Sequence, residues 1–447
     1  MNMICKTTVT EINTLVANKC CSQKCYFKHL FCIKDVYDAI KLLRNNKTDG
    51  SNQWSNSIIN GCHRLFVYLS ILFNLMLKHT FSPKDLLVST IVPIQKNKKK
   101  SLNDSNNYRG IALSSIIGKV LELLILNSNR EILKSCDLQF GFKPKHSTTQ
   151  CTFVLNEVIK YFNNKNSDVF VMMLDASKAF DRVHYVSLFK IMLHKGLCPL
   201  ICSLLACMYL MQSVRIKWGH YISNVVTVTN GVKQGSILSP ILFTLYMDEM
   251  FLKLKKSGLG CHIGDTHMGS LGYADDDILL SPTLFAMKKM LKICDDFGIK
   301  YNVMFNADKY QFLHFPINKS QTIQGISHNG VYIKCVPYSK HLGHIVGASN
   351  TTRVMDEAIS SFNVSLNSIL NTFGNVYIPV KYKLFKTYCM SLYGCVLWDF
   401  DCTQMNRFYV SWRKALRRLY NLSNRTHNRY IHLICKDTPV KAVIQTV

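Results

Sequence analysis

Long apolar runs are missing from this sequence. The longest candidate, Leu65–Leu77, is interrupted by Asn74 and is shorter than the stretch of about 20 residues that a membrane-spanning helix needs. The first residues, Met1–Thr8, contain no charged segment that leads into an apolar stretch. We therefore expect neither a transmembrane helix nor a secretory signal, and we expect the cysteines to be reduced thiols inside a cell.

Acidic residues are scarce as well. The chain has 27 Asp and Glu against 54 Lys and Arg, so its formal net charge at neutral pH is +27. This excess favours a polyanionic partner such as nucleic acid. An anionic membrane surface is the alternative, and the missing transmembrane helix weakens it. With 447 residues, of which 48% are hydrophobic, the chain is long enough to bury a large core in roughly two or three structural modules.

Fixed-period repeats and long low-complexity tracts are also missing, which excludes solenoid and array architectures. Cysteine, in contrast, is plentiful, with 18 residues. Cys21, Cys25, His29 and Cys32 fall close together and could in principle surround zinc. Their spacing lacks the usual two-residue gap between the first cysteines, so buried or incidental thiols are the preferred interpretation. The role of this cluster stays open.

The spacing of apolar residues predicts a chain of mixed α and β structure. Helices are predicted over Asp35–Arg44, over Leu65–Leu77, in a segment ending at Leu126, and through much of the chain after residue 348. Strands are predicted over Leu87–Ile94, from Tyr108, over Val169–Leu174 and on both sides of Asp275–Asp277. The lysine-rich, turn-rich residues before Tyr108 make the first two strands a basic hairpin. The last long helix is amphipathic, with an apolar face of Met405, Phe408, Trp412, Leu416 and Leu419 and a basic face that includes Arg413, Lys414, Arg417 and Arg418.

Carboxylates stand at the ends of two predicted strands. Asp175 ends one apolar run, and Asp275, Asp276 and Asp277 lie at the turn of a predicted hairpin. Clustered carboxylates repel one another, so they need either a cation or full solvation. Mg²⁺ prefers carboxylate and phosphate oxygens, and two ions about 4 Å apart can stabilise phosphoryl transfer. Asp175, Asp275 and Asp276 suit such a site, and a solvent-exposed acidic turn is the alternative.

A series of blocks in a fixed order resembles reverse transcriptases. The blocks are Ile91–Lys96, Asn107–Leu113, Gln139–Thr148, Asp175-Ala-Ser-Lys-Ala-Phe-Asp181, Gly231–Pro240, Tyr273-Ala-Asp-Asp276, Phe305–Lys309 and Lys340–Gly343. The amino-acid sequences of these blocks are similar to those of non-LTR, LINE-like retrotransposons, with jockey-like elements among the candidates. The resemblance runs from about Asp35 to the end of the chain and is strongest from Leu77 to Gly347.

The resemblance implies an α+β, right-hand polymerase with fingers, a palm that carries an antiparallel sheet, and a helical thumb. We expect a Cys-rich leader of unclear role over residues 1–35 and a helical N-terminal extension of the fingers over 36–76. Fingers and palm are expected over 77–347. A helical thumb or C-terminal region, which the chain could truncate, is expected over 348–447. Gly50–Asn52 lacks the Asp expected in the extension, which puts the role of the extension in doubt.

The resemblance also implies catalytic roles. Asp175 and Asp275 match the metal ligands of the family, and Asp276 matches a carboxylate that supports them. The implied cofactor is a pair of Mg²⁺ ions, for which Mn²⁺ could substitute. Lys309 matches a lysine that protonates the pyrophosphate leaving group, and plain neutralisation of phosphate is the equal alternative. Asp277 stands where relatives often carry an aliphatic residue, and we expect it to be a solvated hairpin charge.

Nucleotide-binding roles follow in the same way. Lys96 and Arg109 match positions that hold the triphosphate, and the planar fork of Arg suits two hydrogen bonds to phosphate oxygens. Phe180 matches the bulky aromatic that excludes a ribose 2′-hydroxyl, although core packing would also explain it. Gln234 and Gly235 match residues near the nascent base pair. Gly110 replaces a proline that many relatives carry, which is common variation.

The implied activity is RNA-directed DNA polymerisation on an RNA template, with a DNA primer and deoxynucleoside triphosphates. Work in the nucleus or in a cytoplasmic ribonucleoprotein is expected from the family. No endonuclease is visible in the roughly 35 residues before the resemblance begins, so strand nicking would need a separate endonuclease or a longer reading frame. A polymerase that copies RNA into RNA usually has Gly-Asp-Asp instead of Ala274–Asp276. The remaining alternative is a catalytically inactive, nucleic-acid-binding remnant of a mobile element.

Overall fold

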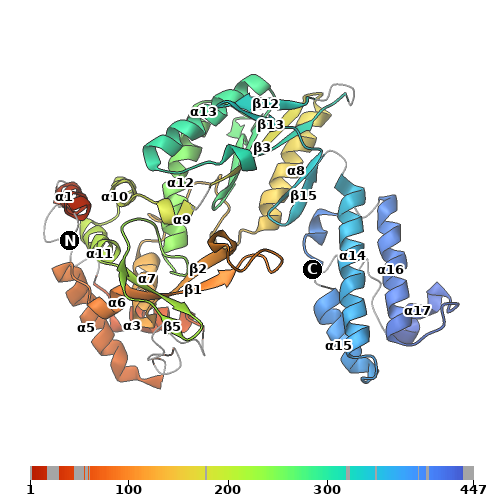
Figure 1. The fold of residues 1–447 in the computed structure, drawn as a ribbon, viewed down its shortest axis with the longest axis horizontal. Helices are drawn as coiled ribbons and strands as arrows, with labels where there is room; N and C mark the ends of the chain where they lie inside the picture. Colours follow the sequence, from red (N-terminus) through yellow and green to blue (C-terminus); the bar gives the residue numbers. More distant parts are fainter. Residues whose placement is uncertain are drawn as a thin grey trace. The chain divides into compact units, whose positions relative to one another are not determined.

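Helices and strands alternate along the chain, which is shown as a computed structural model in Figure 1. The structure describes residues 3–17, 30–44, 55, 59, 61–176, 179–318, 323–347, 350–390, 392–398 and 402–435. Two compact units are distinguished. The first comprises Met1–Lys145, Leu174–Asp277 and Phe285–Lys309, and the second comprises His146–Met173, Ile278–Leu284 and Tyr310–Val447.

Parts of the sequence-based predictions lie outside the described residues. They are Cys21, Cys25 and His29 of the cysteine cluster, Gly50–Asn52 of the N-terminal extension, and Ser177 and Lys178 of the block that begins at Asp175. Cys32 is described as an exposed free thiol. Three of the four residues of the cluster thus lie outside the described residues, and the preference for incidental thiols over a zinc site remains a prediction.

The first unit is mainly helical. Its helices are α1 (Met3–Ala17), α3 (Ile33–Leu42), α5 (His63–His79), α6 (Lys84–Leu87), α7 (Ile116–Ser128), α9 (Ala179–Arg182), α10 (Tyr185–His194), α11 (Pro199–Leu210), α12 (Ser239–Lys256) and most of α13 (Leu284–Tyr301). Helix α1 packs against α10 and α11, and α3 packs against α5 and α7. The helices predicted near residues 35–44 and 65–77 are confirmed as α3 and α5. Helix α5 ends where Thr80 adopts a left-handed conformation (φ 49°), just before the predicted stop at Phe81.

A five-stranded sheet in this unit presents the predicted basic hairpin. Its strands are β1 (Val88–Gln95), β2 (Tyr108–Leu113), β4 (Ser213–Trp218), β5 (Tyr221–Ile222) and β6 (Val226–Thr227). The order is β2-β1-β4-β5, with β6 on β4. Strands β1 and β2 are antiparallel and place Arg109 opposite Ile94, whereas β1 and β4 are parallel. A separate short hairpin joins β7 (His262–Ile263) to β8 (Thr266–His267).

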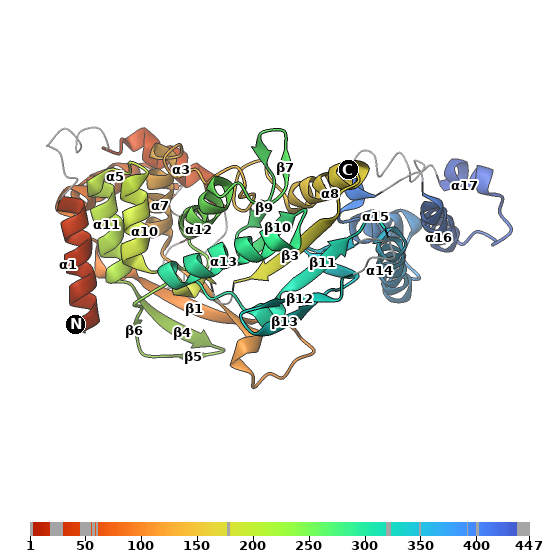
Figure 2. The ribbon, with the colours of Figure 1, turned by 90° about the horizontal axis from the view of Figure 1, so that it is seen from above.

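A four-stranded sheet carries the acidic strand ends. Its order is β11-β3-β10-β9, with β3 (Val169–Asp175), β9 (Ser270–Tyr273), β10 (Asp276–Ser281) and β11 (Gln311–Phe315), which Figure 2 labels. Strand β3 is buried along its length until Asp175, as its uninterrupted apolar run predicts. Because β3 and β10 are neighbours, the end of β3 and the start of β10 bring two acidic segments to one place. Both predicted strand elements are confirmed.

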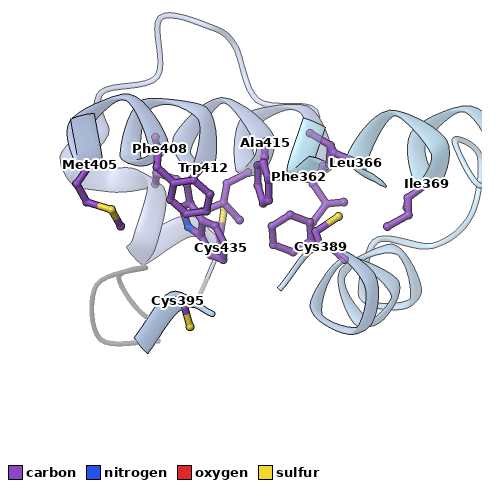
Figure 3. Packing of buried hydrophobic residues seen from close by; sticks show 14 of the residues in the cluster. Phe362, Leu366, Ile369, Cys389, Cys395, Met405, Phe408, Trp412, Ala415 and Cys435 are labelled. Atoms are coloured by element: carbon purple, nitrogen blue, oxygen red, sulfur yellow. The ribbon is translucent and has the colours of Figure 1, made fainter. Parts of the chain in front are cut away.

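The second unit contains α8 (Thr148–Asn164), small hairpins and a helical bundle. The hairpins pair β12 (Gly325–His328) with β13 (Val331–Lys334), and β14 (Tyr338–His341) with β15 (His344–Gly347). The bundle consists of α14 (Asn350–Thr372), α15 (Ile378–Cys389), α16 (Thr403–Leu419) and α17 (Asn428–Cys435). Figure 3 shows its core, where Phe362, Phe408 and Trp412 pack together. The predicted apolar face of α16 is confirmed, because all five of its residues are fully buried.

The search for a membrane-crossing segment gives a plain result. No helix within the described ranges combines the length and the apolar character that crossing a bilayer requires.

Candidate active site

The acids predicted to act together lie in the first unit. Asp175 ends β3, and Asp275 follows Ala274 at the turn between β9 and β10. Ala274 has a left-handed backbone (φ 64°), which lets the chain reverse tightly between the two strands. Burial raises the pKa of Asp275, and the charge of Asp175 adds to this effect. Asp276 is exposed at the surface of the turn but is partly desolvated by its neighbours, and this desolvation, followed by the charges of Asp275 and Asp175, raises its pKa to about 6.

These shifts show that negative charge at the turn is only partly compensated. Arg109 is the cation whose charge lowers the pKa of Asp275 and of Asp276, yet the net shift of both is upward. A carboxylate whose ionised form is opposed by burial and by like charges is stabilised by a bound cation. The donors are all oxygen atoms, which suits a hard divalent ion such as Mg²⁺. By donor chemistry and charge, the residues present fit a divalent metal.

The carboxylates of Asp175, Asp275 and Asp276 do not form a ready-made metal site in this structure. Among the residues that the structure describes, no three His, Cys, Asp or Glu side chains lie close enough together to hold a metal ion as they stand. Lys309 Nζ lies 2.8 Å from Oδ2 of Asp175, where the ammonium supplies positive charge to one of the acids. Asp175 is therefore paired with Lys309.

Lys309 reaches Asp175 because its segment is tied to the end of β3. The amide of Asn306 donates a hydrogen bond to the backbone oxygen of Asp175 (3.2 Å), and Phe305 forms an antiparallel bridge with Ala176. A short 3-10 helix, Ala307–Lys309, then turns Lys309 back toward the carboxylate. The structure thus brings together two of the residues predicted to be catalytic, which lie far apart in the sequence.

Phe180 lies in α9, five residues after Asp175, and packs against two other aromatic rings. Its ring stacks on Phe243 of α12, with centroids 4.4 Å apart and planes 18° apart. The Phe142 ring packs edge-on against the Phe180 ring, with centroids 6.4 Å apart. Phe243 is fully buried whereas Phe180 is half-buried, so one side of the Phe180 ring is packed while part of the side chain stays accessible. The stacking shows core packing, and exclusion of a ribose 2′-hydroxyl by Phe180 stays a prediction.

The glycine-containing block is fixed directly to the segment that carries Phe180. Val232 N donates to the backbone oxygen of Phe180 (2.8 Å), and Gly231 N donates to that of Val183 (3.0 Å). Gly231 has φ 87°, and a Cβ there would lie 2.8 Å from the backbone of Asp181. Any other residue would clash, so glycine is required for this close approach.

Gln234 and Gly235 connect the same block to the basic hairpin. The amide of Ala112 on β2 donates a 2.7 Å hydrogen bond to the backbone oxygen of Gln234. Gly235 has φ 114°, and a Cβ on it would lie only 2.6 Å from the backbone oxygen of Ala112. Strand β2 also carries Arg109, so Gln234 and Gly235 are joined through the backbone to the strand that holds Arg109.

The two basic residues of the hairpin share a face but differ in their contacts. Arg109 lies opposite Ile94, and Lys96 is two residues further along, so alternation places all three on one face. Arg109 acts electrostatically on Asp275 and Asp276. Lys96 instead donates a 3.1 Å hydrogen bond from Nζ to the backbone oxygen of Asn106 in the hairpin loop. Arg109 thus acts on the acids, whereas the hydrogen bond of Lys96 is made within the hairpin.

Asp277 corrects the sequence-based expectation. It was expected to be a solvated hairpin charge, but it is fully buried, and neither carboxylate oxygen has a hydrogen-bond partner. A side chain on Gly272 would meet both the Phe251 ring and the Asp277 carboxylate, which shows how closely the core surrounds it. Burial, with Asp275 and Asp276, raises the pKa of Asp277 well above its usual value. Packing by neighbouring elements, which the local sequence does not reveal, overrides the preference of an acid for solvent.

Replacing Asp277 by Val is expected to stabilise the fold. An unpaired buried polar group costs about 1–3 kcal/mol, so the free energy of unfolding at pH 7 should rise by about that amount. Because the folded-state pKa is raised, the native chain loses stability as pH rises above the unfolded-state pKa of about 4. The advantage of Asp277→Val should therefore be smaller at pH 4.5 than at pH 7. Urea unfolding at both pH values measures it.

The control for this prediction is Asp296→Ala, which removes an exposed acid from α13. Its effect on the free energy of unfolding should not grow between pH 4.5 and pH 7. A loss of stability in Asp277→Val at pH 7 would mean that the buried carboxylate has a stabilising partner.

Known proteins are similar to the part of the chain that contains Asp175, Asp275 and Asp276. Residues 94–348, more than half of the chain, match the family described as "Reverse transcriptase (RNA-dependent DNA polymerase)". The chain is 26% identical over 413 residues to the "RNA-directed DNA polymerase from mobile element jockey" of Drosophila funebris, which covers 87% of this chain and 43% of that protein. It is 29% identical over 267 residues to the "Probable RNA-directed DNA polymerase from transposon BS" of Drosophila melanogaster, covering 56% of this chain and 27% of that protein.

A solved structure is also similar in part. The apo telomerase of Candida tropicalis, truncated from its C-terminal domain, gives a TM-score of 0.37 at 15% identity and covers 67% of this chain and 63% of that one. This likeness is too low to carry an argument. The chain spans less than half of the length of the curated relatives it matches.

Proposed function

The chain belongs to the reverse transcriptase family, and on that premise we propose that it is an RNA-directed DNA polymerase of a non-LTR retrotransposon. The resemblance predicted from its motifs is confirmed by the family match and by relatives named as polymerases of mobile elements. One structural observation carries the proposal: β3, which ends at Asp175, lies beside β10, which begins at Asp276 directly after Asp275. Neighbouring carboxylates that can hold divalent ions are what two-metal nucleotidyl transfer uses.

We propose that the architecture is that of a right hand. The five-stranded sheet with its basic hairpin would belong to the fingers, and the four-stranded sheet that ends in acids would belong to the palm. The bundle of α14–α17, with its basic helix α16, would be the thumb. The mixed helix and sheet content supports this assignment.

The acids would hold the metal cofactor. When bound, two Mg²⁺ ions, or Mn²⁺ in their place, would stabilise the attacking and leaving oxygens of phosphoryl transfer. Asp175 and Asp275 would be the ligands, and Asp276 would support the site from beside them. Lys309, whose ammonium already lies 2.8 Å from Asp175, would donate a proton to the pyrophosphate leaving group.

The remaining residues would bind and select the nucleotide. Arg109 and Lys96, on one face of the hairpin, would hold the triphosphate. The Phe180 ring, fixed from behind by Phe243, would face the sugar and exclude a 2′-hydroxyl. Gln234 and Gly235 would line the nascent base pair, where the absence of a side chain on Gly235 permits close approach.

The partners would be an RNA template, a DNA primer and deoxynucleoside triphosphates. A separate endonuclease would supply the nick for insertion into a chromosome, and the site of action would be the nucleus or a cytoplasmic ribonucleoprotein. The excess of basic residues, which gives a formal net charge of +27, supports the nucleic-acid partners.

Primer extension with exchanged templates and nucleotides tests the substrate class. A labelled DNA primer is annealed to RNA and to DNA templates of the same sequence, and deoxynucleotides or ribonucleotides are supplied with Mg²⁺. We expect extension on RNA with deoxynucleotides. A preference for ribonucleotides would identify a polymerase that makes RNA and contradict the proposal.

Activity is expected to fall in acid. Because the pKa of Asp276 is raised to about 6, its carboxyl group becomes protonated as pH falls below that value. Protons then compete with the metal for the site. The rate of primer extension at fixed Mg²⁺ should therefore decline below about pH 6, and more Mg²⁺ should move the decline to lower pH. A rate that stays constant down to pH 4.5 would contradict this.

Binding to a primer–template is expected to weaken steeply with salt. Each phosphate neutralised by Lys or Arg releases counterions, so a protein with several such contacts should lose about a hundredfold or more in affinity between 50 and 200 mM salt. Fluorescence anisotropy with a labelled duplex measures the slope. Replacing the exposed Lys414 of α16 by Gln should reduce the slope by at most about one. Salt-independent affinity would contradict binding through the basic surface.

A further inference from the structure

The block Gln139–Thr148 has so far entered the site only through Phe142, which contacts Phe180. Residues 138–142, at the start of the block Gln139–Thr148, lie along strand β9. Phe140 N donates to the backbone oxygen of Gly272 (2.7 Å), and Gly272 N donates to that of Leu138 (2.8 Å). Gln139 and Gly272 thereby form a parallel bridge. This segment adds a partner to the strand that leads directly into the acidic turn.

The side chain of Gln139 extends this contact to the turn itself. It is fully buried, and its Oε1 accepts hydrogen bonds from the amides of Ala274 (2.9 Å) and Gly141 (3.0 Å). Ala274 immediately precedes Asp275 and has a left-handed backbone. A non-glycine residue in that conformation is disfavoured by about 1 kcal/mol or more, so it persists where its surroundings hold it. The hydrogen bond to the Gln139 oxygen stabilises Ala274 in this conformation.

Gly141 shows how tightly the two segments fit. A Cβ at this position would lie 2.5 Å from Ala274 N and 3.1 Å from the backbone of Tyr273. Real Cβ atoms do not approach that closely, so the position requires glycine even though its φ is ordinary. The turn is therefore held by the hydrogen bond that the Ala274 amide donates to Gln139 and by the close approach of the backbone at Gly141.

We propose that Gln139 is a positioning residue for the catalytic turn: its carboxamide oxygen fixes the Ala274 amide and so sets the direction in which Asp275 projects. The proposal rests on the proposed function, since Asp275 would be a metal ligand. Groups that orient a ligand from outside typically change metal affinity or activity by about 10–100-fold when they are replaced. Gln139 would act through the backbone of the turn and would not touch substrate.

Three variants separate positioning from simple stability. Gln139→Met keeps the length of the side chain but removes the acceptor oxygen. Gln139→Glu keeps an acceptor oxygen, and burial would hold the acid neutral. Asn129→Leu is the matched control, because Asn129 is also buried and polar but bonds to the backbone oxygen of Ile125 at its own helix end (2.9 Å).

The first readout is hydrogen exchange of the peptide that spans 271–277, measured by mass spectrometry without substrate. Gln139→Met should speed exchange there, while Gln139→Glu and Asn129→Leu should not. The second is single-turnover incorporation, in which Gln139→Met should raise the Mg²⁺ concentration for half-maximal rate about tenfold and leave the apparent Kd of the incoming nucleotide unchanged. Gln139→Glu should restore most of the native Mg²⁺ dependence.

Native exchange and native Mg²⁺ dependence in Gln139→Met would overturn the proposal. So would the same change in Asn129→Leu, because it would show a general effect of lost stability. If the native chain extends no primer, the proposed function fails, and the exchange comparison still decides whether Gln139 holds the turn.

Discussion

Replacing Asp275 by Asn is expected to lower the rate of nucleotide incorporation by at least about a thousandfold, which corresponds to about 4 kcal/mol of transition-state stabilisation. Asn keeps the size of the side chain but removes the negative charge that a metal ion requires. Asp175→Asn should have a similar effect, because Asp175 would be the other metal ligand. Single-turnover incorporation of one deoxynucleotide, with enzyme in excess over primer–template, measures the rate.

Two controls make this prediction specific. Asp265→Asn removes a charge from an exposed acid in the turn between β7 and β8 and should leave the rate within about twofold of the native value. Primer–template affinity should be unchanged in Asp275→Asn, since the basic surface is intact. More than a tenth of the native rate in Asp275→Asn would contradict the assignment of Asp275 as a metal ligand.

Truncating Phe180 to Ala is expected to relax sugar selection. Removing the ring opens the space beside the sugar, and we expect the preference for deoxynucleotides over ribonucleotides to fall by about a hundredfold, or about 2.7 kcal/mol. The comparison is of kcat/KM for dCTP and CTP opposite the same template base. Most of the change should be a gain with CTP.

Phe189→Leu is the control for this prediction, because Phe189 of α10 is fully buried and packs edge-on against Tyr209. It should lower stability without changing the ratio of the two kcat/KM values. If Phe180→Ala loses activity equally with both nucleotides, Phe180 serves core packing alone.

Local patterns predicted several of the elements around the site and the helical character of the last hundred residues. The buried run of β3 and the apolar face of α16 follow directly from the spacing of apolar residues, and both are found as expected. The prediction that Asp277 is a solvated charge was wrong, because three consecutive acids cannot be distinguished from one another by sequence pattern. Alternation along β10 turns Asp276 toward solvent and Asp277 into the core beneath Gly272, and only the packed fold shows which acid is buried.

Local sequence patterns also predict the residues of the candidate site better than they predict its geometry. Sequence order identified Asp175 and Asp275 through resemblance, but their approach depends on β3 and β10 becoming neighbours in the sheet. In the sequence, Gln139 stands out only as part of a block, because a buried amide in an irregular segment has no periodic signature. Its position two residues before Gly141, in a block without its own helix or strand pattern, is the available signal. The hydrogen bond of Lys96 to the hairpin loop likewise depends on side-chain conformation, which the sequence does not specify.

The most direct test of the central claim is extension of a DNA primer on a defined RNA template with Mg²⁺ and one deoxynucleotide at a time. The account predicts that the native chain adds only the nucleotide complementary to the next RNA base, and that Asp275→Asn adds none at the same protein concentration. A native chain that is folded and binds the RNA duplex but adds no nucleotide would contradict the account and identify a non-catalytic remnant.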